Sequence, residues 1–199
     1  MNQPGQHVSV AILAGGYSRR MGRDKALLPL GSATLIERVI EAARPLADEL
    51  FLIGDRPERF AHLALPVRPD QQPGQGPLAG LYTALTRAQF PTVLLLACDL
   101  PFVTTHFLRF LLDRRGDHHA LVPRSPQALQ HLCAVYTRNC QDAVAAALER
   151  GERAMPSFHD QIDIRVLAPD EWRRFDPHQR LLANLNTPQE YRQALELLA

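Results

Sequence analysis

Residues 8–25 read VSVAILAGGYSRRMGRDK, an apolar run that leads into a glycine-rich loop with four cations. The near-continuous apolar run from Val8 to Leu13 is typical of a strand that is buried on both faces of a parallel sheet. Glycine lets the backbone approach a ligand closely and adopt positive φ. Arginine and lysine side chains can neutralise phosphate oxygens. The stretch therefore predicts a central strand that ends in a polyphosphate-binding loop.

The loop could instead be a surface turn with solvated charges. Its spacing matches neither the G-K-[ST] phosphate loop nor the G-x-G-x-x-G dinucleotide motif. We favour ligand binding because a buried strand, paired glycines and several cations coincide within a few residues. The cations are Arg19, Arg20, Arg23 and Lys25.

Apolar runs and amphipathic stretches alternate along the chain, at least as far as residue 115. This pattern predicts an α/β fold of three layers, a Rossmann-like, doubly wound and mostly parallel sheet with helices on both faces. The expected strands are 8–13, 50–53, 66–68, 92–98, 120–123, 132–136 and 162–167. The expected helices are 36–43, 78–85, 104–115, 142–150 and a last one from Thr187 with Tyr191, Ala194, Leu195 and Leu198 buried.

Asp99 follows the second strongly apolar run, at the end of Leu96-Ala97-Cys98-Asp99. Ligands of doubly wound sheets lie beyond the carboxyl ends of the strands. If the two apolar strands are neighbours, Asp99 and the glycine loop meet there. Magnesium takes one or two carboxylates together with substrate phosphates, so Asp99 is a candidate Mg²⁺ ligand. The alternative is that Asp99 caps the helix near Thr104 or orders the turn.

Two further loops have residues suited to a nucleotide site. The segment from Asp70 to Leu81 contains two prolines and three glycines and leads into a helix, so it could form a wall around a base or ribose. It could equally be a plain connection. Asn184 and Asn186 precede the last helix, where they could reach a phosphate or a metal-bound water, or only order the turn.

Composition limits the class of protein. The 199 residues carry 22 basic and 21 acidic side chains, a balance that argues against a general nucleic-acid binder. We expect one domain over residues 1–199, with 1–6 as a flexible tail, and no membrane span. Three scattered cysteines and an N-terminus without a signal core favour a cytoplasmic setting. His118, His119 and His131 have no ligand-spaced partners, and we expect structural or exposed roles for them.

The loop Leu13-Ala14-Gly15-Gly16-x-Ser18-x-Arg20-Met21-Gly22-x-Asp24-Lys25 closely resembles the signature of the MobA family, the molybdenum cofactor guanylyltransferases. This family belongs to the sugar-nucleotide-type nucleotidyltransferases. The resemblance continues, in order, through Asp70, Pro73-Gly74-x-Gly76-Pro77-Leu78-x-Gly80, Cys98-Asp99-x-Pro101-Phe102 and Asn184-x-Asn186-Thr187-Pro188. The chain departs from it at Gly54-Asp55, where many relatives have Asn.

The resemblance implies transfer of GMP from GTP to the molybdenum-molybdopterin cofactor, with Mg²⁺. Lys25, Asp99 and Arg20 would act in catalysis, with Asp99 on the metal. The residues expected to bind the substrates are Leu13, Ala14, Gly15, Gly16, Lys25, Asp70, Gly80, Asp99, Asn184 and Asn186, the two asparagines on the pterin or metal side.

The alternatives are a cytidylyltransferase for the same cofactor, a sugar- or alditol-phosphate nucleotidyltransferase, or a nucleotide-binding adaptor without activity. Molybdoenzymes or other cofactor-synthesis proteins would be partners.

Overall fold

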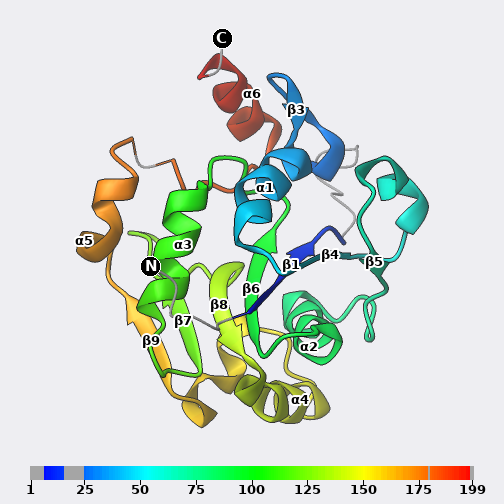
Figure 1. Ribbon diagram of the computed structural model, residues 1–199, viewed down its shortest axis with the longest axis vertical. Coiled ribbons are helices and arrows are strands. Elements are labelled where there is room, and N and C mark those ends of the chain that lie inside the picture. Colours follow the sequence, from blue (N-terminus) through cyan, green and yellow to red (C-terminus); the bar gives the residue numbers. More distant parts are fainter. Residues whose placement is uncertain (1–6, 16–24, 179, 198–199) are drawn as a thin grey trace.

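The computed structural model describes residues 7–15, 25–178 and 180–197, and its main feature is a seven-stranded sheet (Figure 1). The strand order is β5-β4-β1-β6-β8-β7-β9, and every strand is parallel to its neighbours except β8, which is antiparallel to both of its own. The strands are β1 (Val8–Leu13), β4 (Glu49–Ile53), β5 (Val67–Arg68), β6 (Thr92–Ala97), β7 (Ala120–Pro123), β8 (Cys133–Thr137) and β9 (Ile164–Leu167).

Helices cover both faces of the sheet, which confirms the three-layer α/β prediction. Val10 and Ile12 belong to the same apolar cluster as α1 and α3, whereas Ala11 belongs to the cluster of α2 and α4. This alternation along β1 explains its continuous apolar sequence, since both of its faces are buried. The helices are α1 (Leu35–Ala43), α2 (Pro77–Arg87), α3 (Thr105–Arg114), α4 (Gln141–Glu149), α5 (Pro169–Trp172) and α6 (Pro188–Glu196).

Two helices begin with a capping box. The Thr34 side chain accepts from the Glu37 backbone N–H, and the Glu37 carboxylate accepts from the Thr34 backbone N–H, so α1 has a complete capping box. Thr187 and Glu190 form the same box at α6, with Pro188 at the first helical position. These local signals fix both helix starts.

Three features differ from or add to the expectations. The chain forms a short antiparallel hairpin, β2 (Pro29–Leu30) and β3 (Ala33–Thr34), which the sequence interpretation did not include. Strand β8 is antiparallel because residues 124–132 are too few for a crossover connection. The prediction that Leu195 is buried is wrong, since it is 39% exposed while Ala194, about 100° around the helix, is buried. Leu198 lies outside the described residues.

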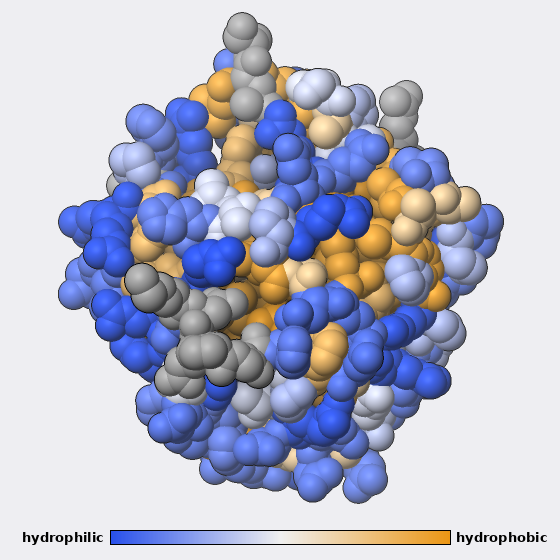
Figure 2. Space-filling model, viewed as in Figure 1, coloured by the Kyte–Doolittle hydropathy of each residue, from blue (hydrophilic) through white to orange (hydrophobic). Residues whose placement is uncertain are grey.

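The surface in the same view is hydrophilic around its outline, and apolar residues gather in the middle (Figure 2). Among the described residues no helix is both long and apolar enough to cross a membrane.

Candidate functional site

The carboxyl ends of β1 and β6 lie side by side, which meets the condition for Asp99 to lie beside the end of β1. Leu13 is paired with Ala97 in the sheet, and the Cys98 N–H donates to the Leu13 carbonyl at 3.2 Å. On the other side of β1, the Ala14 N–H donates to the Ile53 carbonyl at 2.9 Å. The chain moves outward from β1 through β4 and β5 and then returns to place β6 on the opposite side, so the strand order reverses here. Such a switch point is where doubly wound sheets bind ligands.

Lys25, Asp99 and Asn186 form a cluster at this edge, which we call the Lys25 cluster. The Lys25 ammonium donates to Asp99 Oδ2 in a short contact and to Asn186 Oδ1 at 2.6 Å. Lys25 is only 8% exposed. The Leu185 backbone N–H also donates to the Asp99 carbonyl at 3.2 Å, which holds the C-terminal segment against the strand end. Three loops far apart in sequence therefore meet at one buried cation.

The second carboxylate oxygen of Asp99, Oδ1, is orphaned, that is, buried without a hydrogen-bond partner among the described residues. An ionised oxygen that is buried without a partner is costly, so such atoms usually face a ligand, water or ion. A hard divalent cation such as Mg²⁺ prefers this kind of donor. The described residues contain no group of three or more His, Cys, Asp or Glu side chains that could bind a metal. The donor set therefore fits an ion that takes most of its ligands from substrate and water.

The capping alternative for Asp99 is wrong. Helix α3 is capped by Thr104, whose side chain accepts from the Phe107 N–H at 3.3 Å. The neighbouring Cys98 behaves as expected of a packing residue, because burial and then the Asp99 charge raise the pKa of its thiol to about 12. Cys98 is thus a poor nucleophile.

Asp70 lies on the opposite side of β1 from the Lys25 cluster, after β5. Its Oδ1 accepts from the Thr83 hydroxyl at 2.9 Å and from the Gln72 N–H at 3.1 Å. The loop then reaches Gly76, whose φ of 83° favours glycine, and α2 begins at Pro77. Asp70 is therefore built into the loop, and a direct nucleotide contact stays a prediction.

The glycines have different environments. Gly15 lies beside Gly54, and a Cβ on Gly15 would be 3.7 Å from the Gly54 Cα. Gly80 is buried in α2, where a Cβ would lie 2.9 Å from Leu13 Cδ2. The structure thus gives Gly80 a packing function, since its missing side chain lets α2 approach the end of β1. Gly16 and Arg20 lie outside the described residues, so their contacts stay predictions.

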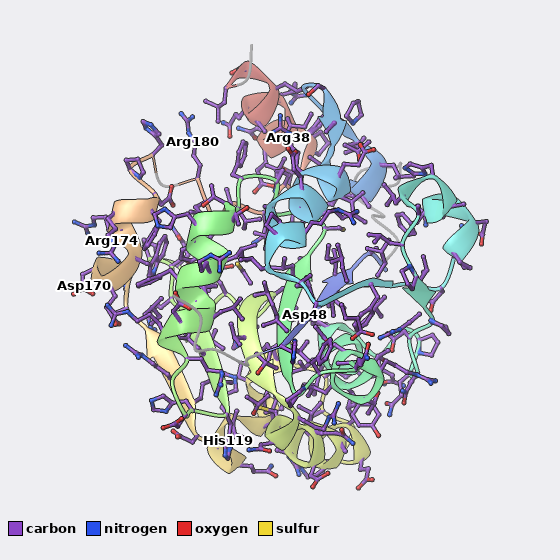
Figure 3. All side chains as sticks on the ribbon, viewed as in Figure 1. Arg38, Asp48, His119, Asp170, Arg174 and Arg180 are labelled. Atoms are coloured by element: carbon purple, nitrogen blue, oxygen red, sulfur yellow. The ribbon has the colours of Figure 1, made fainter. Side chains whose placement is uncertain are left out.

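A cavity of about 850 Å³ adjoins the Lys25 cluster on its C-terminal side. Asn184 and Asn186 both line it, and Asn186 also accepts from Lys25, so cavity and cluster share a residue. Arg180 extends from the segment between α5 and α6 (Figure 3). The wall combines amides, cations and an aromatic ring, from Gln127, Gln130, Gln193, Arg173, Arg180 and Trp172. Three acidic residues, Asp176, Glu190 and Glu196, also line the cavity and offset the arginines. The mixture of amides, charges of both signs and an aromatic ring suits a polar, planar ligand.

His131 and His159 form a pair that sequence reasoning missed. Their ring centroids are 4.9 Å apart, and His131 Nδ1 and His159 Nε2 are buried without hydrogen-bond partners among the described residues. Burial, and then the charge of His159, lower the pKa of His131 to about 4. This packing agrees with the structural role expected for His131. The contact with His159 had no signal in the sequence, because the two residues are far apart along the chain and meet only through packing.

We expect His131 to weaken the fold in acid. With a pKa of about 4 in the fold and 6.5 ordinarily, the unfolded chain binds more protons below pH 6.5, so stability falls as pH decreases from about 6.5 toward 4. His131→Gln should lose less thermal stability between pH 7.5 and 5 than the native protein. His62→Gln, at an exposed position, should follow the native curve. An unchanged pH dependence in His131→Gln would contradict the assignment.

Comparisons with known proteins cover the segments that contain Lys25, Asp99 and Asn186. Residues 10–162 match the family model described as a MobA-like NTP transferase domain. A probable molybdenum cofactor guanylyltransferase of Carboxydothermus hydrogenoformans is 36% identical over 194 residues, covering 98% of each chain. Molybdopterin-guanine dinucleotide biosynthesis protein A from Archaeoglobus fulgidus has a TM-score of 0.81 and 26% identity, covering 95% of this chain and 97% of that one.

A 2-C-methyl-D-erythritol 4-phosphate cytidylyltransferase from Thermus thermophilus shares the fold, with a TM-score of 0.70 and 19% identity over 96% of this chain and 98% of that one. The family match includes the β1 end, Asp70 and Asp99, and the match to the Carboxydothermus relative extends over the segment with Asn184 and Asn186 as well. On these grounds the chain belongs to the MobA-like NTP transferase family.

Proposed function

We propose that this protein transfers GMP from GTP to the molybdenum-molybdopterin cofactor, giving the guanine dinucleotide cofactor and pyrophosphate. The Lys25 cluster is the observation that carries the proposal. It joins a buried cation, a carboxylate with an orphaned oxygen and an amide that also lines the cavity. The names of the Carboxydothermus and Archaeoglobus relatives, 36% and 26% identical to this chain, agree with this reaction.

The chemistry requires positioning and charge stabilisation more than a strong base. An acceptor phosphate is already ionised at neutral pH, so it can attack the α-phosphorus of GTP without losing a proton first. Negative charge then builds up on the departing pyrophosphate. A preorganised ammonium such as that of Lys25 stabilises this charge, and arginines of the loop, Arg20 among them, would add to it.

Asp99 is the residue that would hold Mg²⁺. When bound there, the ion would neutralise phosphate charge that the side chains alone leave uncompensated. Asp99 Oδ1 supplies the hard, buried oxygen, while Lys25 keeps Oδ2 in a fixed orientation. Asn186 is bonded to the same ammonium and limits its movement.

The two substrates would approach from opposite sides of the Lys25 cluster. We place GTP over the ends of β1 and β4, against Leu13, Ala14, Gly15, Gly16 and Asp70. Gly80 would contribute by packing against the Leu13 side chain. We place the pterin in the cavity beside Asn184 and Asn186, where amides could pair with a heterocycle and Arg180 with its phosphate.

The whole chain would act as one nucleotidyltransferase domain, since β1 and β9 belong to the same seven-stranded sheet. We propose a cytoplasmic location, because Cys98, Cys133 and Cys140 are free thiols, as is usual in reducing compartments. Molybdoenzymes or other cofactor-synthesis proteins are the proposed partners.

The test is a nucleotide panel. Purified protein is incubated with Mg²⁺, molybdenum-loaded molybdopterin and one of GTP, CTP, ATP or UTP, and pyrophosphate and dinucleotide product are both measured. We expect product and pyrophosphate in equal amounts with GTP. Turnover with CTP alone would contradict the guanylyl assignment, and turnover of GTP only with a sugar or alditol phosphate would contradict the acceptor. Nucleotide binding without any turnover would indicate an adaptor.

A further inference from the structure

Thr83 is a buried polar residue in the middle of α2. It is 0% exposed, and its helix neighbours Leu81, Ala84 and Leu85 belong to the apolar core. A buried hydroxyl is costly unless it is hydrogen-bonded. The Thr83 hydroxyl therefore needs hydrogen-bond partners, and it finds them in the loop after β5.

The Thr83 hydroxyl joins α2 to the loop after β5 through two bonds. It donates to Asp70 Oδ1 at 2.9 Å and accepts from the Gln71 backbone N–H at 3.0 Å. The same Oδ1 accepts from the Gln72 N–H at 3.1 Å. One hydroxyl thus fixes both a carboxylate and the backbone direction of the loop.

We infer that Thr83 is a positioning residue for nucleotide binding, which acts by orienting Asp70. The inference rests on the proposed function, in which Asp70 faces the nucleotide. Both bonds to the Asp70 side chain use Oδ1, and Oδ2 accepts no hydrogen bond among the described residues. A carboxylate oxygen only accepts, so Oδ2 suits a donor of the nucleoside, a ribose hydroxyl or a base N–H. With Oδ1 fixed from a rigid helix, Oδ2 has a defined direction before the nucleotide arrives.

The matched control is Thr86, one turn further along α2. Its hydroxyl accepts from the Gln71 side-chain amide at 2.7 Å and donates to carbonyls of its own helix, with no bond to Asp70. Thr86→Val therefore makes the same chemical change in the same helix. Thr83→Ser keeps the hydroxyl while removing a methyl group.

We expect Thr83→Val to raise KM for GTP about tenfold or more, because a bond to a charged group is lost. KM for the pterin acceptor should stay unchanged, Thr83→Ser should be close to the native protein, and Thr86→Val should change KM for GTP by less than about twofold. Comparing 2′-deoxyGTP, 3′-deoxyGTP and ITP with GTP then tests the two ribose hydroxyls and the exocyclic amino group of guanine one at a time. For the nucleotide that lacks the donor to Asp70, the native protein and Thr83→Val should have similar KM values.

Two results would overturn the inference. One is a Thr83→Val variant with a lower Tm and an unchanged KM for GTP, which would make the hydroxyl merely structural. The other is a Thr83→Ser variant as weak as Thr83→Val. If Thr83→Val does not fold, Thr83→Cys takes its place, since the thiol keeps the volume and is a weak donor. Turnover by the native protein tests the proposed function. Equilibrium binding of each nucleotide to the native protein and the variants tests the role of Thr83 separately, because it does not depend on turnover.

Discussion

Asp99→Ala is expected to reduce turnover by at least about 100-fold, the usual size of a lost charge-stabilising group. The substitution removes the orphaned Oδ1 and also leaves the Lys25 ammonium with Asn186 as its remaining partner in the Lys25 cluster. Asp99→Asn keeps the volume and one neutral oxygen. It should recover part of the activity only at raised Mg²⁺, because an amide oxygen is a weaker ligand than a carboxylate.

Asp48 is the matched control, since it lies at the opposite end of β1 (Figure 3). Its carboxylate accepts from the Val8 N–H at 2.8 Å and from His7, so Asp48→Ala also removes a carboxylate that contacts β1. Turnover per folded molecule should stay at the native level. Native turnover in Asp99→Ala would remove Asp99 from the mechanism, and equal losses in both variants would point to stability instead of chemistry.

Local patterns in the sequence were sufficient for most elements of the fold. Val8–Leu13 and Ala120–Pro123 form strands with the expected bounds, and Thr34 and Thr187 cap the expected helices. These features depend on neighbours within four residues, such as a capping box or an apolar run. The adjacency of β1 and β6 was only a condition in the sequence analysis, and the sheet meets it where the strand order reverses.

The site was predictable only in part. Sequence reasoning placed Lys25 and Asp99 at one edge, yet the contact of Asn186 with Lys25 joins residues 161 positions apart and has no local signal. The pairing of His131 with His159 is similar, since it depends on how a 3₁₀ helix (Met155–Gln161) packs. Gly80 was chosen from a motif as a binding residue, and only the packed helix shows that its missing side chain leaves space for Leu13.

Lys25→Met is expected to lower both stability and turnover, and the two losses can be separated. Methionine retains much of the apolar stem but has no ammonium, so the Asp99 carboxylate, 15% exposed, stays buried without its cation. Breaking a buried pair on one side costs about 3–5 kcal/mol of stability. Under the proposed mechanism, loss of the charge that stabilises phosphate should reduce turnover by at least about 100-fold and weaken GTP binding. Denaturant unfolding and steady-state kinetics on the same preparations measure the two effects.

The double variant Lys25→Met/Asp99→Asn distinguishes structure from chemistry. It leaves no unpaired charge in the Lys25 cluster, so its stability should return most of the way to that of the native protein, as expected when both members of a buried pair are neutralised together. Its turnover should stay as low as that of Lys25→Met, because neither the ammonium nor the carboxylate proposed to hold Mg²⁺ is present. If turnover returned together with stability, the pair would serve the fold alone, and phosphate stabilisation would have to come from the arginines of the glycine loop.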